Sequence, residues 1–252
     1  MNGDEQIASF VATMWLVGAR VLGMMLVAPV LGHTAVPLRL RVLMAVVIAL
    51  AVSGGLSQPA VSGAAILPAV AVEVLLGVTI GLAVRMVFVG IELAAHHVGQ
   101  QMGVSLAAAF DPFSAGGDAV RRLYVMLAVV LLLGFGGHRM IISALLRTFD
   151  AVPPGAFAPG DAMAGFIATV ATAGFALALK VAAPVLLAML LATAAMGILQ
   201  RTVPQCHILS VGMPVRVMLG LVALAAAVAV VAPVMEGALD FVLREVANLT
   251  GA

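Results

Sequence analysis

The hydrophobic residues of this chain fall into long runs, separated by short breaks that are rich in glycine and proline. The runs lie near residues 6–32, 38–54, 64–106, 119–148, 161–201 and 206–247. They are rich in alanine and leucine and lack turn residues at strand spacing, so each run predicts helix. The pattern therefore predicts an all-α protein with about six hydrophobic segments.

The segments differ in length, and this difference carries information. A helix that spans a bilayer needs about 20 residues, yet the third, fifth and sixth segments are roughly twice as long. We expect them to be kinked, to fold as hairpins or to project beyond the lipid, with Pro184, Pro214 and Pro233 as candidate kinks.

Composition explains where such helices can exist. Hydrophobic residues make up 64% of the chain and charged residues 9%, whereas soluble domains carry about 25% charged residues. The chain therefore lacks the polar surface of a soluble fold, which predicts an integral membrane protein. Because no polar linker or charge run divides it, we expect a single domain over residues 1–252.

Charge and cysteine content exclude several classes of function. The formal net charge of +1 offers no basic surface for nucleic acid. Cys206 is the only cysteine, which excludes an internal disulfide and a cysteine metal cluster.

The third segment carries the most regular polar pattern. Glu73, Gly77, Gly81 and Arg85 are spaced four residues apart, so they share one helical face. The pattern continues further along the same segment through Glu92, His96, Gly99, Gln100 and Gly103. Ionisable groups at membrane depth are costly unless paired or hydrated, so this face should not contact lipid.

Three interpretations of this face stay open. It could be an internal helix contact in which Glu73 pairs with Arg85, a subunit interface or channel wall, or an ion-coupling site. Gly77 and Gly81 have the spacing that lets a second helix approach closely. On that basis we expect Gly81→Ala to be tolerated and Gly81→Leu to block assembly.

Catalytic and metal-binding alternatives find little support. His96 and His97 are adjacent and point about 100° apart on a helix, which does not suit one shared metal ion. Ser105 with His138 could suggest an intramembrane serine protease, but Ala107 replaces the closing glycine of the nucleophile motif. Lys180 fits a transporter's coupling lysine or a structural charge. We expect no catalytic residue, cofactor or metal.

Several short motifs stand in a fixed order along the chain. The earlier ones are Arg20-x-x-Gly23, Pro29, Val36-Pro37-x-Arg39, Glu73-Val-Leu-Leu-Gly77-x-x-x-Gly81, Gly99-Gln100-Gln101-Met102-Gly103 and Phe110-Asp111-Pro112. The later ones are Gly136-Gly137-His138, Phe149 through Pro153-Pro154-Gly155, Ala183-Pro184, Gly197-x-x-x-Arg201-x-x-Pro204-Gln205 and Gly212-x-Pro214. Together they resemble the FliR family of the flagellar type III export apparatus and its injectisome counterpart, SctT. Cys206-His207 departs from the family, which often has Met-Asn there.

The resemblance implies an export-gate subunit without catalytic activity. Such a subunit assembles with FliP-like and FliQ-like subunits, neighbours an FlhB-like subunit, and helps form the pore for unfolded export substrates. It lies in the bacterial inner membrane, in the flagellar basal body, as a multi-pass protein in contact with lipid. Asp111-Pro112 and Gly136-Gly137-His138 favour the flagellar over the injectisome system. The alternative is a secondary transporter that uses Glu73, Arg85 and Lys180.

The resemblance also implies that Phe110, Asp111, Pro112 and Phe113 belong to a loop that plugs the closed pore. Without the resemblance, the chemistry of these residues is compatible with two interpretations of the apolar turn. It could be a loop at the membrane interface or a loop inside a protein cavity.

The plug assignment makes the first prediction. Burying a phenylalanine contributes about 1.5–3 kcal/mol, which biases a closed state by about one to two orders of magnitude. Deleting residues 107–116 should therefore preserve assembly and let ions leak, as measured by membrane conductance. A deletion that assembles and conducts no more than the parent would leave the loop as an interfacial turn.

Overall fold

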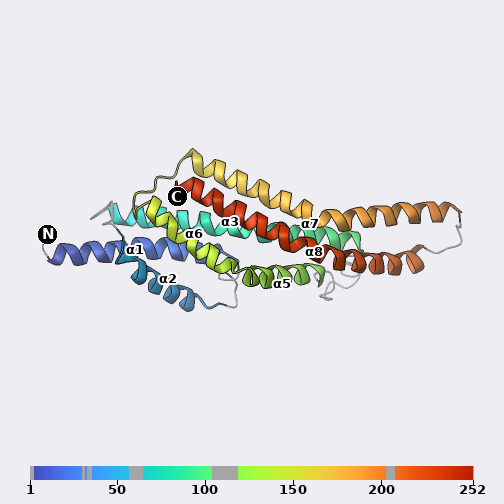
Figure 1. The fold of residues 1–252 in the computed structure, drawn as a ribbon, viewed down its shortest axis with the longest axis horizontal. Coiled ribbons are helices and arrows are strands. Elements are labelled where there is room, and N and C mark those ends of the chain that lie inside the picture. Colours follow the sequence, from blue (N-terminus) through green and yellow to red (C-terminus); the bar gives the residue numbers. More distant parts are fainter. Residues whose placement is uncertain are drawn as a thin grey trace. The chain divides into compact units, whose positions relative to one another are not determined.

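The computed structural model describes residues 3–29, 32, 36–56, 65–103, 119–202 and 208–251, and within these ranges it contains no strand. The helices (Figure 1) are α1 (Gly3–Val27), α2 (Leu38–Ser53), α3 (Ile66–Gln101), α5 (Ala119–Gly134), α6 (Gly137–Ala151), α7 (Asp161–Thr202) and α8 (Ile208–Thr250). The predicted all-α fold class is confirmed.

The fourth predicted segment was wrong in one respect, because the chain there forms two helices instead of one. α5 ends at Gly134 and α6 begins at Gly137. Gly136 lies between them with a φ of +71°, a left-handed conformation that interrupts a helix and that glycine adopts at little cost.

The chain is a multi-pass membrane protein by the length and composition of its helices. Among the described residues, four stretches are long and apolar enough to cross a membrane: Gln6–Val27, Ile66–Met102, Asp161–Leu199 and Pro214–Thr250. The last three contain 37, 39 and 37 residues, which confirms that they exceed the roughly 20 residues of a simple span. α7 continues through Pro184, and α8 continues through Pro214 and Pro233.

The helices gather into two compact units. Unit 1 contains Met1–Met86, Gly136–Ala173 and Leu239–Ala252, and unit 2 contains Val87–Phe135 and Gly174–Ala238. α3, α7 and α8 each contribute residues to both units. The single domain expected from the sequence stays a prediction.

Unit 1 is organised around α1. α2 returns beside it, with Gly18 of α1 facing Ala49 of α2. α3 packs against α1 so closely that glycine is required on both helices. A Cβ atom at Gly23 would lie 2.5 Å from the carbonyl oxygen of Val74, and one at Gly77 would overlap the carbonyl oxygen of Arg20.

Gly81 extends the same contact by one turn, since a Cβ there would lie 2.6 Å from the carbonyl oxygen of Met24. Residue numbers rise together along the two helices, so α1 and α3 run in the same direction. The structure thus places Gly77 and Gly81 in an internal contact between α1 and α3.

Unit 2 also contains close contacts at glycines, but between other helices. A Cβ at Gly90 of α3 would lie 2.5 Å from the carbonyl oxygen of Gly174 in α7, and one at Gly220 of α8 would overlap the side chain of Met102. Small residues therefore determine how closely the long helices approach each other within this unit.

These distances correct the expectation for alanine at position 81 and generate the second prediction. Because the obstructing atom is a backbone oxygen, Gly81→Ala must push α1 and α3 apart, at a cost of about 1–3 kcal/mol. Gly18→Ala is the matched control, since its Cβ would meet Ala49 at an ordinary 3.7 Å. Thermal unfolding in detergent, with the protein purified in complex with the subunits it assembles with, should show a lower midpoint for Gly81→Ala only. Equal midpoints would mean that the two helices can separate freely.

Candidate functional site

An ion pair between α1 and α3 is buried in unit 1. Arg20 and Glu73 are both fully buried. The Arg20 Nε donates to Glu73 Oε2 at 2.6 Å, and Arg20 Nη2 donates to Glu73 Oε1 at 3.1 Å. This two-pronged geometry is the strong form of an arginine–carboxylate contact.

Arg20 also binds the C-terminal end of α6. Its Nη1 donates to the carbonyl and the hydroxyl oxygens of Thr148, at 3.0 and 3.1 Å. Its Nη2 donates to the carbonyl oxygen of Val152 at 3.1 Å. A guanidinium has five N–H donors, and all five are now accounted for.

Glu73 is held by a third donor as well. The backbone N–H of Gly155 donates to Glu73 Oε1 at 2.8 Å. Gly155 has a φ of +82°, which lets the chain turn after Pro153 and Pro154 at little conformational cost. The ring of Phe149 stacks under the Arg20 guanidinium, with 4.2 Å between its centre and Cζ.

These groups together form the Arg20–Glu73 cluster: Arg20, Glu73, Thr148 and Phe149 with the backbone of Val152 and Gly155. Its formal charges cancel and its donors are paired, so the desolvation cost of burying them is largely offset. It joins α1, α3, α6 and the segment after α6. The cluster is therefore a structural connection and leaves no free group for chemistry.

The predicted pairing of Glu73 with Arg85 is wrong, because Glu73 pairs with Arg20. Glu73 and Arg85 are twelve positions apart in one helix. Their backbones are therefore about 18 Å apart, which is beyond the reach of their side chains. Arg85 is half-buried on the same helix. The sequence did single out Arg20, Glu73 and the segment from Phe149 to Gly155, but as separate motifs.

The remaining residues of the predicted face lie in unit 2 and do not converge on one point. Glu92 is half-buried and His96 is exposed; a ring nitrogen of His96 lies 3.0 Å from the side-chain nitrogen of Gln100. Gly99 is buried against Val120, and Gly103 follows the end of α3 with a φ of +76°. Within the described ranges, no three His, Cys, Asp or Glu side chains form a possible metal site.

The other residues singled out by the sequence are dispersed. Pro37 precedes α2 and its carbonyl accepts the N–H of Leu40 at 3.0 Å, while Gly137 is buried at the start of α6. The exposed ones are His138, Lys180, Pro184, Arg201 and Pro214. Some residues singled out by the sequence lie outside the described residues: Ser105, Pro204, Cys206 and His207, and Phe110, Asp111, Pro112 and Phe113, whose role as a pore plug stays a prediction.

The fold and the Arg20–Glu73 cluster define the class of protein. It is an all-helical, multi-pass membrane protein in which this buried charge pair has a structural role. The model of the family described as bacterial export proteins, family 1, matches residues 11–242. The chain belongs to this family.

Similar proteins that carry a name support the same family assignment. The chain is 32% identical to the flagellar biosynthetic protein FliR of Escherichia coli K12, over 86% of this chain and 84% of the relative. It is also 32% identical to the FliR of Caulobacter vibrioides, over 83% and 86%, and 26% identical to that of Bacillus subtilis, over 70% of each. The resemblance to the FliR family is confirmed.

The cluster makes the third prediction. Arg20→Ala leaves Glu73 buried without its counter-charge, which should destabilise the protein by about 3–5 kcal/mol. Arg20→Lys should not restore stability, since an ammonium cannot reproduce the planar set of contacts. Arg20→Met with Glu73→Leu removes both charges and should be more stable than Arg20→Ala. Thermal unfolding in detergent measures all of these variants, each purified in complex with the subunits it assembles with.

The matched control is Arg139→Ala, because Arg139 is an exposed arginine of α6, and its loss should cost less than about 0.5 kcal/mol. If the effects of the Arg20 and Glu73 substitutions were simply additive, the two side chains would not be coupled.

Proposed function

We propose that this chain is a non-catalytic subunit of the flagellar type III protein export gate in the bacterial inner membrane, within the flagellar basal body. It assembles there with FliP-like and FliQ-like subunits beside an FlhB-like subunit, and unfolded flagellar proteins cross through the shared pore. Membership in the bacterial export family supports this proposal, as do relatives that are named flagellar biosynthetic proteins.

The observation that carries the proposal is an apolar surface longer than lipid can cover. Large exposed hydrophobic residues lie along α7: Ile167, Phe175, Leu179, Leu187, Leu190, Leu191, Ile198 and Leu199. Measured along the helix this is about 48 Å, against about 30 Å for the hydrocarbon core of a bilayer. Part of that surface must therefore contact other apolar protein.

α8 adds to the same argument. Its candidate span is the most apolar of the four, with a mean hydropathy of 2.6, and only 22% of that stretch is buried within the chain. The buried share of the candidate span in α3 is 61%. α3 is thus largely an internal helix, whereas α7 and α8 offer surface to lipid and to partner subunits.

The transporter alternative is weakened by the Arg20–Glu73 cluster. A coupling carboxylate must exchange its partner during transport, but Glu73 accepts three hydrogen bonds from α1 and the segment after α6. Lys180, the other proposed coupling residue, is exposed on α7. The injectisome alternative is disfavoured by relatives that carry the flagellar name.

Co-expression tests the proposal and gives the fourth prediction. Expressed alone, the protein should aggregate or be degraded, because the outer faces of α7 and α8 lack partners. Expressed with FliP-like and FliQ-like subunits, it should purify as one large complex, measured by size-exclusion chromatography with mass determination. Leu190→Arg and Ile198→Arg place charges on the α7 face and should reduce the yield of that complex. His138→Arg, at an exposed position of α6, is the control.

A stable, monodisperse monomer in detergent would contradict the proposal and support a transporter. Full export by cells whose only copy of the protein is Leu190→Arg, measured as flagellar filament length, would also contradict it.

A further inference from the structure

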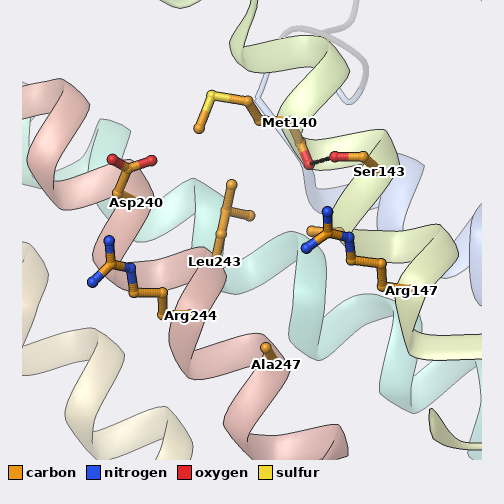
Figure 2. Close-up of a pocket in the computed structure, with 8 residues that line it drawn as sticks. Met140, Ser143, Arg147, Asp240, Leu243, Arg244 and Ala247 are labelled. Atoms are coloured by element: carbon orange, nitrogen blue, oxygen red, sulfur yellow. Dashed lines mark hydrogen bonds between the residues drawn. The ribbon is translucent and has the colours of Figure 1, made fainter. Parts of the chain in front are cut away.

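A pocket of about 280 Å³ lies between α6 and the last turns of α8, entirely within unit 1. α6 contributes Met140, Ser143 and Arg147, and α8 contributes Asp240, Leu243 and Arg244 (Figure 2). None of these side chains belongs to the Arg20–Glu73 cluster, so the pocket is separate from the contact that joins α1 and α3.

Two arginines of the pocket have no partner among the residues that the structure describes. Arg147 and Arg244 are exposed, and neither is in an ion pair or a hydrogen bond there. Figure 2 shows Arg147 reaching from α6 toward Leu243, with Arg244 and Asp240 on the other side of that leucine. Two arginines and one aspartate give the pocket a net positive charge, which attracts an anionic group.

The hydrogen-bond donors of the pocket suit a carboxylate. The Ser143 hydroxyl donates to the carbonyl oxygen of Met140 at 2.9 Å, so its proton is already used and the guanidinium groups remain. A guanidinium binds a carboxylate through two parallel hydrogen bonds. Sites for small molecules usually measure about 300–1,000 Å³, so a pocket of this size is better suited to one side chain than to a whole ligand.

The surroundings of the arginines are apolar, which favours a protein as the source of that carboxylate. Met140 and Leu243 line the pocket and are half-buried. Phe241 is 41% exposed and lies three positions before Arg244, so it is a neighbour of Arg244 on the surface of α8. Arginine, methionine and aromatic residues are enriched at protein–protein interfaces. A small anion would bind the arginines alone, whereas a protein segment would also cover the apolar side chains.

We infer that this pocket binds the carboxylate of an Asp or Glu side chain from a partner subunit. The carboxylate oxygens accept hydrogen bonds from Arg147 and Arg244, and apolar atoms beside them cover Met140 and Leu243. Asp240 repels the incoming carboxylate, which makes it a useful probe. This contact rests on the assembly proposed above, because the carboxylate belongs to another subunit, and it adds a specific point of attachment on unit 1.

Photo-crosslinking tests the inference in the complex with FliP-like, FliQ-like and FlhB-like subunits. A photo-reactive amino acid in place of Ser143, which is exposed at the pocket, should crosslink to one subunit within a helical turn of an Asp or Glu, as located by mass spectrometry. Arg147→Gln with Arg244→Gln should lower the crosslink yield at least about tenfold, because both charged hydrogen-bond donors are lost. Arg139→Gln, on α6 but outside the pocket, should crosslink as the parent does.

Exchange of charges separates loss of the contact from loss of the fold. Arg147→Glu with Arg244→Glu should abolish the crosslink, and so should an arginine in place of the crosslinked acidic residue, because like charges then face each other. The two changes together should restore it, which damage to the fold could not do. Asp240→Asn removes a repulsive charge, so the crosslink should persist at higher salt concentration than in the parent.

Three results would overturn the inference. A complex that forms normally but gives no crosslink from position 143 to a subunit, or one remote from any Asp or Glu, would exclude this contact and leave the proposed assembly intact. A crosslink that charge exchange does not restore would show that the arginines do not pair with that residue. Failure of any complex to form would contradict the proposed function itself, and this contact with it.

Discussion

The fold of unit 1 depends on a charge pair placed where a charge is most costly. In a membrane, Arg20 and Glu73 have no water to solvate them, so each requires the other and all their remaining hydrogen-bonding positions must be filled. The backbone carbonyls of Thr148 and Val152 and the N–H of Gly155 fill them. Helices with little hydrophobic driving force to associate in lipid thereby acquire a specific contact, since lipid competes for apolar surface but not for these polar groups.

The sequence predicted the helical class, the overlong segments and the residues that matter in unit 1, because those follow from hydrophobic pattern, glycine spacing and motif order. It predicted the wrong partner for Glu73. Spacing of four residues shows which side chains share a helical face, but not which other helix meets that face, and Arg20 lies 53 positions away. The break at Gly136 was also missed, because a local φ angle leaves no trace in hydrophobic periodicity. Sequence reasoning did not detect the pocket that α6 and the end of α8 form around Arg147 and Arg244, because these two residues are nearly a hundred positions apart.

Burial divides the long helices by role. α3 is the internal helix, with a glycine contact to α1 in unit 1 and another to α7 in unit 2. α7 and α8 keep most of their apolar surface outward. Only 9% of the residues are charged, and the described ones occupy contrasting surroundings. Arg20 and Glu73 are buried and join helices, whereas Arg147 and Arg244 are exposed.

The glycines between α1 and α3 restrict how one helix can slide along the other. Sliding α3 by four residues along α1, about 6 Å, would bring Glu73 or Arg85 to a position where a glycine now meets a backbone carbonyl, so the close packing would be lost. The same slip would place Glu73 opposite an apolar residue and separate Arg20 from its carboxylate, which would leave two buried charges unpaired. The glycine contacts and the charge pair therefore select the same alignment of the two helices.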